Sequence, residues 1–122
     1  MMYIGEYVSS VIEALDPFFA EQAKRLPGVM RLFGLFHRVF INSSPTWKFH
    51  KDYKDLDLSA VVPLALPFKG GQLDLSAGLD PPIAFDIQPG AFGILSSATV
   101  WHTNLALSEG TRQSIVFVLH KQ

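Results

Sequence analysis

The sequence predicts an α+β fold that is mainly β, with helices first and a sandwich or barrel of short strands after them. Apolar residues recur at helical spacing over roughly the first 26 residues. From His37 onward, short β-rich runs alternate with Gly, Pro, Asn and Asp. Short strands at a spacing of about 8 to 12 residues are typical of all-β architectures.

Length and composition indicate one globular domain, with residues 1–36 as helical support and residues 37–122 as the β core. The chain is 48% hydrophobic and 17% charged, a balance that excludes wholesale disorder. Its net charge of -1 gives no electrostatic footprint for tight, nonspecific binding to a nucleic-acid backbone.

The absence of cysteine excludes disulfides, thiolate zinc sites and cysteine nucleophiles, and it fits an intracellular protein. The N-terminus carries Glu6 and Glu13 and no basic region, so it does not read as a secretory signal. No apolar run approaches the roughly 20 residues that span a bilayer. We therefore expect a cytoplasmic or nuclear protein without a membrane partner.

The helical pattern divides at Pro17, because proline is tolerated at the first position of a helix but not in its interior. Asp16 is then the N-cap of a second helix that ends near Leu26. The segment from Val29 to Phe36 is ambiguous between helix and strand. Four phenylalanines are expected to pack a helix against the outside of a sheet: Phe18, Phe19, Phe33 and Phe36.

Eight runs are predicted as strands: Arg38–Asn42, Thr46–His50, Ser59–Pro67, Gln72–Leu75, Ile83–Gln88, Phe92–Leu95, Val100–Leu105 and Gln113–His120. The breakers between them are Ser43-Ser44-Pro45, Lys69-Gly70-Gly71, Gly78 to Pro82, Pro89-Gly90 and Ser108-Glu109-Gly110.

Two histidines and one aspartate form the candidate metal site. His50 and Asp52 lie two residues apart at the end of a strand, so their side chains leave the same face of the sheet. His102 lies in the penultimate strand, and roughly four predicted strands separate it from Asp52, enough to cross a barrel and return. Two imidazoles and a carboxylate are the ligand set of non-haem Fe(II) oxygenases.

A second pair begins the last strand. Arg112 and Ser114 are also two residues apart and share a face. A guanidinium beside a hydroxyl suits a carboxylate, because arginine binds carboxylates in a bidentate manner.

The pattern His50-x-Asp52, His102, Arg112-x-Ser114 resembles the 2-oxoglutarate/Fe(II)-dependent dioxygenases. Gly70-Gly71-Gln72-Leu73 and Gln88-Pro89-Gly90-Ala91-Phe92 look like turns that recur in that superfamily. The resemblance covers roughly Phe36 to Lys121. Within the superfamily, the overall texture is most similar to a fungal branch related to the TET/JBP thymine and methylcytosine hydroxylases.

The resemblance implies a double-stranded β-helix, or jelly roll, in which two four-stranded sheets enclose the site. His50, Asp52 and His102 would be the catalytic iron ligands, and O2 would occupy a remaining position. Arg112, assisted by Ser114, would bind the distal carboxylate of 2-oxoglutarate, which is decarboxylated to succinate as the substrate is hydroxylated. The substrate is unknown. The resemblance favours a modified nucleobase, and therefore nucleic acid as the partner. In many fungal relatives an asparagine follows the His-x-Asp pair closely, where this chain has Tyr53-Lys54-Asp55.

Other interpretations remain open. The stretch from His50 to Asp57 also fits a charged turn before a buried strand. The fold could be an inactive or truncated double-stranded β-helix that acts as an interaction module, or a cupin-like metal-binding barrel. Exposed edge strands of so short a barrel could be covered in a homodimer.

Neighbouring residues receive plainer interpretations. Asp55 and Asp57 are expected in a solvated turn, and His37 and His120 at ordinary strand ends. Trp47 and Trp101 adjoin the proposed ligands and point to the opposite face of their strands, where we expect core residues.

Overall fold

The fold consists of two helices followed by β-strands, as predicted. The computed structural model describes residues 2–26, 33–42, 49–64, 68–76 and 81–120. Several predicted segments therefore lie wholly or partly outside the described residues, namely 29–32 before Phe33, the turn at 43–45, the first part of the 46–50 strand with Trp47, the end of the 59–67 strand, and most of the turn at 78–82.

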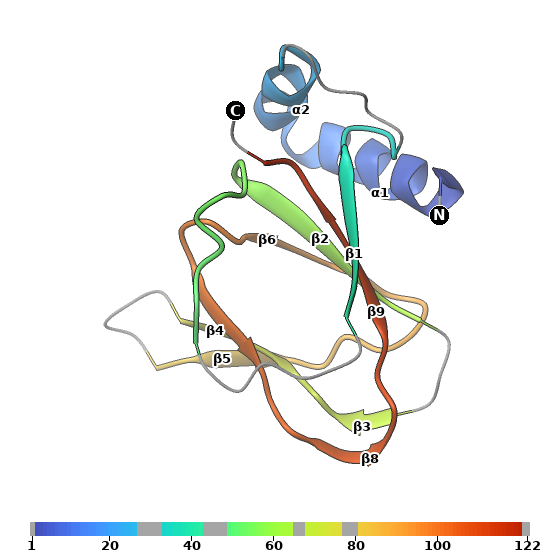
Figure 1. Ribbon diagram of the computed structural model, residues 1–122, viewed down its shortest axis with the longest axis vertical. Coiled ribbons are helices and arrows are strands. Elements are labelled where there is room, and N and C mark those ends of the chain that lie inside the picture. The colour runs from blue at the N-terminus through green and yellow to red at the C-terminus, as the bar shows by residue number, and fades with distance from the viewer. Residues whose placement is uncertain (1, 27–32, 43–48, 65–67, 77–80, 121–122) are drawn as a thin grey trace.

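The strands of the described residues form three antiparallel sheets (Figure 1). The large sheet has the order β1-β9-β2-β6, with β1 at Arg38–Asn42, β9 at Ser114–Val118, β2 at Leu58–Pro63 and β6 at Gly93–Ser96. The second has the order β5-β4-β7, with β5 at Ile83–Phe85, β4 at Leu73–Ser76 and β7 at Trp101–Asn104. The third pairs β3 at Phe68–Gly70 with β8 at Leu107–Gly110. The resemblance implies two sheets of four strands each. The described residues instead form one sheet of four strands, one of three and one of two.

The helices cover one face of the large sheet (Figure 1). Helix α1 spans Met2–Leu15 and α2 spans Pro17–Lys24. The predicted cap is confirmed, because the Phe19 N–H donates to Asp16 Oδ1 at 3.0 Å and Pro17 opens the helix. Helix α2 ends at Lys24, two residues before the predicted end. No helix in the part of the chain that the structure describes is long and apolar enough to cross a membrane.

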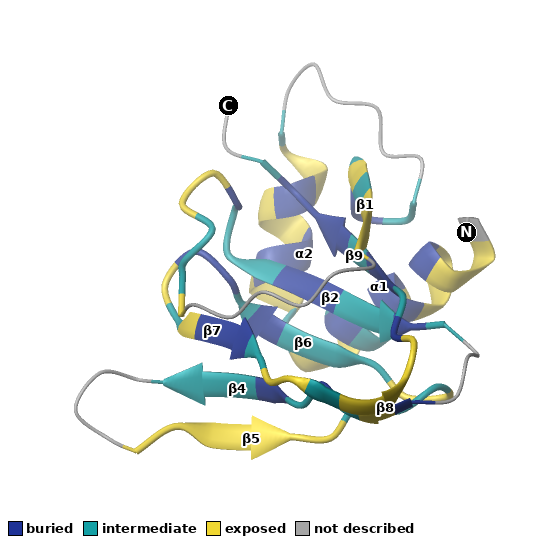
Figure 2. Ribbon diagram, turned by 60° about the horizontal axis from the view of Figure 1, so that its bottom comes forward, coloured by how far each residue is buried: buried dark blue, intermediate teal, exposed yellow. Residues whose placement is uncertain are grey.

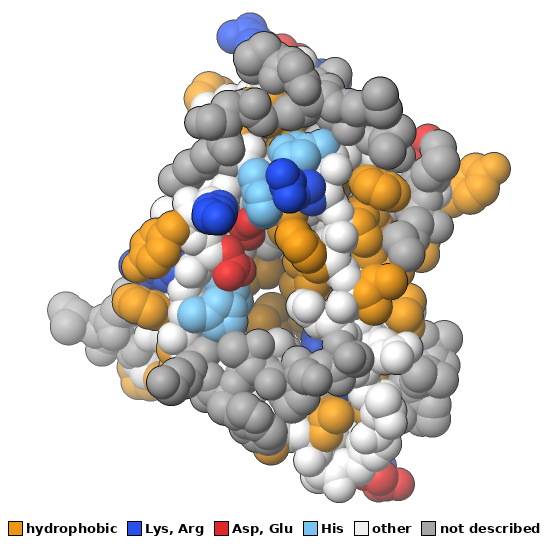
Figure 3. Space-filling model, viewed as in Figure 1, with side chains coloured by type: hydrophobic (Ala, Val, Ile, Leu, Met, Phe, Trp, Pro, Cys, Tyr) orange, Lys and Arg blue, Asp and Glu red, His pale blue; other side chains and the backbone are white. Residues whose placement is uncertain are grey.

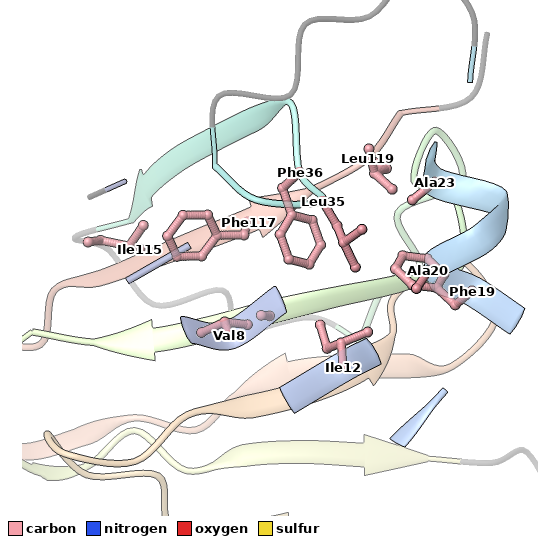
Figure 4. Packing of buried hydrophobic residues seen from close by; sticks show 11 residues of the cluster. Val8, Ile12, Phe19, Ala20, Ala23, Leu35, Phe36, Ile115, Phe117 and Leu119 are labelled. Carbon is pink, nitrogen blue, oxygen red and sulfur yellow. The ribbon is translucent and has the colours of Figure 1, made fainter. Parts of the chain in front are cut away.

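The main core lies between the helices and the large sheet (Figure 4). Phe117 of β9 is fully buried, and its ring centroid lies 5.9 Å from that of Phe36. Ile12 of α1 and Phe19 of α2 belong to the same cluster. Phe18 is 73% exposed, so its predicted packing role is wrong. Successive residues of a helix point about 100° apart, and Phe19 occupies the buried side.

Alternation along β9 gives the large sheet a second, inner face. Ile115 and Phe117 point to the helices, so Ser114 and Val116 point away from them, toward the other sheets. The side chain of Ser114, on this inner face, is 1% exposed.

Two predicted breakers proved to be strands. Residues 68–70 and 107–110 pair as β3 and β8, and the pairing continues through the Gly71 N–H to Ala106 O bond (3.0 Å) and the Leu105 N–H to Gln72 O bond (2.9 Å) into β4 and β7. We call this continuous pair of chain segments, 68–76 and 101–110, the bent ribbon. Its bend lies at Gly70 and Gly71, which have φ of +80° and +67°. Glycine here bends a ribbon without ending it, which local composition cannot distinguish from a turn.

Candidate metal centre

His50 and His102 face each other across an antiparallel bridge. Each backbone N–H donates to the carbonyl of the other residue at 3.0 Å, so the two residues form a hydrogen-bonded pair. Opposite residues in such a pair project to the same face, and the ring centroids lie 4.3 Å apart. The backbone therefore brings together two imidazoles that are 52 positions apart in the sequence.

Asp52 completes the cluster from two residues further along. Its Oδ2 lies 3.0 Å from His102 Nε2, and its Oδ1 lies 3.7 Å from His50 Nε2. The three potential ligand atoms lie within 4.8 Å of one another. Two donors bonded to one cation at about 2.1 Å are at most about 4.2 Å apart, so a small side-chain rotation would place all three around one ion. The structure thus brings together the three predicted ligands.

Hydrogen bonding prepares His102 for a metal. Its Nδ1 lies 2.8 Å from the Val100 carbonyl oxygen, which can only accept, so Nδ1 carries a proton and Nε2 is directed at Asp52. Burial alone would lower the pKa of His102, but the hydrogen bonds to Asp52 and Val100 outweigh burial and raise it. The hydrogen bond from His102 lowers the pKa of Asp52 below its ordinary value, against the opposing effect of burial. An arriving cation would displace the proton on Nε2.

Ser97 supports the turn that carries Asp52. The Ser97 carbonyl accepts the Asp52 N–H at 2.8 Å, and its hydroxyl donates to Asp55 Oδ2 at 2.6 Å. Asp55 is 5% exposed, so the prediction of a solvated turn is wrong for this residue. His120, expected at an ordinary strand end, places Nε2 3.5 Å from Asp55 Oδ1. Asp55 therefore supports the turn from its buried side, through Ser97 and His120.

Asp57 and Trp101 take surface roles. Asp57 is half-buried, and Ser96 Oγ donates to its Oδ1 at 3.2 Å. Trp101 is 39% exposed, and Lys51 Nζ lies 4.7 Å from its ring centroid. The predicted core role of Trp101 is thus wrong, because its strand neighbour His102 takes the inner face and leaves Trp101 on the outer one.

A cavity of about 610 Å³ opens beside the cluster. It is lined by His50, Asp52 and Asp55 together with Phe40 and Val116 of the large sheet. Figure 3 shows histidine and acidic side chains gathered along a hollow in this face of the molecule. The candidate metal centre therefore borders a space large enough for a small molecule.

Arg112 carries a buried positive charge. It is 9% exposed, burial lowers its pKa, and Nε has no hydrogen-bond partner among the described residues. The structure gives it no ion pair with a described carboxylate; its guanidinium carbon lies 5.9 Å from the Phe68 ring centroid. A buried guanidinium in this condition is chemically suited to an anion, which would supply the missing hydrogen-bond acceptor.

Ser97 and Asp55 are the supporting residues that sequence reasoning missed. Asp55 had one available signal, since an aspartate three residues after Asp52 can close a turn, and the Asp55 N–H does donate to Asp52 O at 2.9 Å. Ser97 had none, because its role depends on a backbone carbonyl and a hydroxyl brought close by the fold.

Solved structures that resemble this fold include the following two. A 2OG-Fe(II) oxygenase family oxidoreductase from Burkholderia pseudomallei aligns with a TM-score of 0.59 and 24% identity, over 68% of this chain and 43% of its own. A prolyl-4-hydroxylase from Pseudomonas putida aligns with a TM-score of 0.50 and 17% identity, over 69% of this chain and 51% of its own. The aligned part thus spans about half the length of either structure.

The matches define the class of fold. The chain has a mainly β fold with two helices, consistent with the jelly roll of the 2OG-Fe(II) oxygenases. No family model matches the sequence, and neither does any curated protein.

Proposed function

We propose that this chain is a 2-oxoglutarate- and Fe(II)-dependent dioxygenase that hydroxylates its substrate. The observation that carries the proposal is the joint presence of His50, Asp52 and His102 around one point and a buried Arg112 without an ionic partner among the described residues. The first group fits Fe(II), and Arg112 fits a carboxylate. The likeness of fold to 2OG-Fe(II) oxygenases supports the same conclusion.

The chain's own residues would divide the work. His50, Asp52 and His102 would hold the metal by three positions and leave others open. Arg112 would bind the distal carboxylate of 2-oxoglutarate, with Ser114 beside it on the inner face. Bound Fe(II) would supply the redox chemistry by which O2, 2-oxoglutarate and the substrate are converted to succinate, CO2 and the hydroxylated product. Val100 and Ser97 would keep His102 and Asp52 in place.

The direct test is an anaerobic titration with Fe(II) and then 2-oxoglutarate, followed by the visible charge-transfer band of the chelated complex. We expect the band in the wild type and its loss in His102→Ala. In Arg112→Ala we expect the band to form only at a much higher concentration of 2-oxoglutarate. A folded wild-type protein that binds Fe(II) without a band would favour the cupin-like interpretation. A folded protein that binds no metal would favour the interaction module.

For the substrate we propose a modified nucleobase, which the sequence resemblance favours. Phe40, Tyr53 and Asn42 line the cavity beside the metal centre and offer aromatic faces and an amide to a planar, hydrogen-bonding ring. The test compares succinate release with oligonucleotides that contain thymine or 5-methylcytosine and with peptides that contain proline. Stimulation by the peptides alone would overturn the nucleobase proposal.

A further inference from the structure

Gly71 leaves space that the side chain of Arg112 occupies. A Cβ atom built on Gly71 would lie 3.1 Å from Arg112 Cδ and 2.9 Å from Leu107 Cδ2. Both distances are shorter than ordinary van der Waals contacts, which are about 3.5 to 4 Å between carbons. The stem of Arg112 thus packs against the bare backbone of Gly71, and any side chain there would push it away.

The backbone at Gly71 is itself fixed in place. Its φ of +67° lies in the left-handed region, and its N–H donates to Ala106 O at 3.0 Å. Its carbonyl accepts from Asn104 Nδ2 at 3.4 Å. Asn104 lies two residues after His102 on β7, so both side chains project from the same face. The bent ribbon therefore carries both a proposed metal ligand and the surface on which Arg112 rests.

We propose that Gly71 is a positioning residue for Arg112, and that it sets where the distal carboxylate of 2-oxoglutarate binds relative to the metal. This inference rests on the proposed function. Gly71 does not touch the cosubstrate in this account; it acts through the guanidinium. A side chain at position 71 should therefore weaken recognition of the distal carboxylate and leave the metal site intact.

The first experiment needs no metal or cosubstrate. A buried Arg112 Nε–H should give a distinct resonance in a proton–nitrogen NMR spectrum of the whole chain, assigned by its loss in Arg112→Lys. We expect Gly71→Ala to shift this resonance. An unchanged resonance in a folded Gly71→Ala protein would overturn the inference, whatever the function of the chain.

The second experiment measures recognition of the distal carboxylate. Anaerobic Fe(II)-loaded protein is titrated with 2-oxoglutarate and with 2-oxobutyrate, which has the same 2-oxo acid end but no distal carboxylate. In the wild type we expect 2-oxoglutarate to bind about tenfold or more tightly than 2-oxobutyrate, the usual range for a charged hydrogen bond. In Gly71→Ala the ratio should fall toward one, with 2-oxobutyrate binding unchanged.

Matched variants separate this effect from backbone strain. Gly90 also has a left-handed φ, +98°, and a Cβ there would meet nothing within 4 Å. Gly90→Ala should therefore keep the wild-type ratio. If Gly71→Ala does not fold, Gly71→Ala with Leu107→Ala removes the tighter contact and keeps the one with Arg112. A ratio in the folded double variant equal to that in Leu107→Ala alone would overturn the inference.

The outcomes also separate this inference from the proposed function. A wild type that binds neither 2-oxo acid in the presence of Fe(II) overturns the proposed function and the role in cosubstrate binding together. A wild type that discriminates between them tenfold, beside a Gly71→Ala protein that does so equally well, overturns only the role of Gly71.

Discussion

The Ser97 hydroxyl donates a 2.6 Å hydrogen bond to Asp55 Oδ2, and the same residue's carbonyl accepts the Asp52 N–H. Ser97, in the segment after β6, therefore hydrogen-bonds to both ends of the turn that carries the proposed metal ligand Asp52. The Asp55 carboxylate at the other end of this turn is buried, and we expect its burial to affect stability.

Burial raises the pKa of Asp55 and Asp52 adds to the rise, whereas Ser97, His120 and His102 oppose it. A carboxyl with a raised folded-state pKa stabilises the fold below its unfolded pKa, about 4, and loses that contribution as the pH rises through the folded value. Asp55→Asn cannot ionise and still accepts from the hydroxyl. We expect its free energy of unfolding, relative to wild type, to increase from pH 4 to pH 7 in urea titrations.

The matched control is Asp57→Asn, the same chemical change at a half-buried carboxylate with a serine donor. It measures how much of any change in stability comes from replacing an aspartate by asparagine, apart from the burial of Asp55. A difference between Asp55→Asn and wild type that is constant from pH 4 to pH 7 would show that burial does not control this carboxyl.

Metal binding should stabilise the fold. A ligand that binds only the native state at one hundred times its Kd adds about 2.7 kcal/mol, or roughly 10 °C in the Tm of a domain of this size. We expect such a rise with Fe(II), or with Mn(II) under air, in thermal unfolding scans. His50→Ala should abolish it, whereas His37→Ala, which removes a histidine outside the cluster, should keep it. A rise that survives in His50→Ala would place the bound metal elsewhere.

Arg112 should reduce the stability of the unliganded fold. A buried charge without a partner is unfavourable, and exchange of buried ionic groups for apolar ones of similar volume is often neutral or stabilising by about 1 to 4 kcal/mol. Arg112→Met should therefore unfold at the same or higher urea concentration while it loses tight binding of 2-oxoglutarate. Arg38→Met, at an exposed site on β1, is the control and should change stability by less than about 0.5 kcal/mol. A large loss in Arg112→Met would mean that the guanidinium supports the fold itself.

Phe117 should be the most sensitive position of the core. It is fully buried in the core between the helices and the large sheet, so Phe117→Ala is expected to lower the free energy of unfolding by about 3 to 5 kcal/mol. Phe85→Ala, on the exposed edge strand β5, removes the same ring at 48% exposure and should be much milder (Figure 2). If Phe117→Ala and Phe85→Ala lower the free energy of unfolding equally in urea titrations, the position of the core is contradicted.

Much of the fold could be predicted because local signals agreed with it. Asp16-Pro17 specified the start of α2, and period-two patterning located most strands and placed His50 with Asp52 on one face. The strands at 68–70 and 107–110 escaped prediction because their glycines, which look like turn residues, form a bend. Asp55 escaped because its burial depends on Ser97, 42 positions away in the sequence. Such long-range contacts leave no periodic trace.

The place of β9 in the large sheet has a consequence for how the chain acquires its structure. β1 and β2 are near in sequence but do not pair; each binds an opposite edge of β9, which follows β2 by about fifty residues. As the chain emerges from the ribosome, both helices and β2 are complete long before Phe117 exists to cover them. Folding is therefore expected to wait for the last strand. A nascent chain stalled before residue 114 would expose apolar surface and be prone to aggregation.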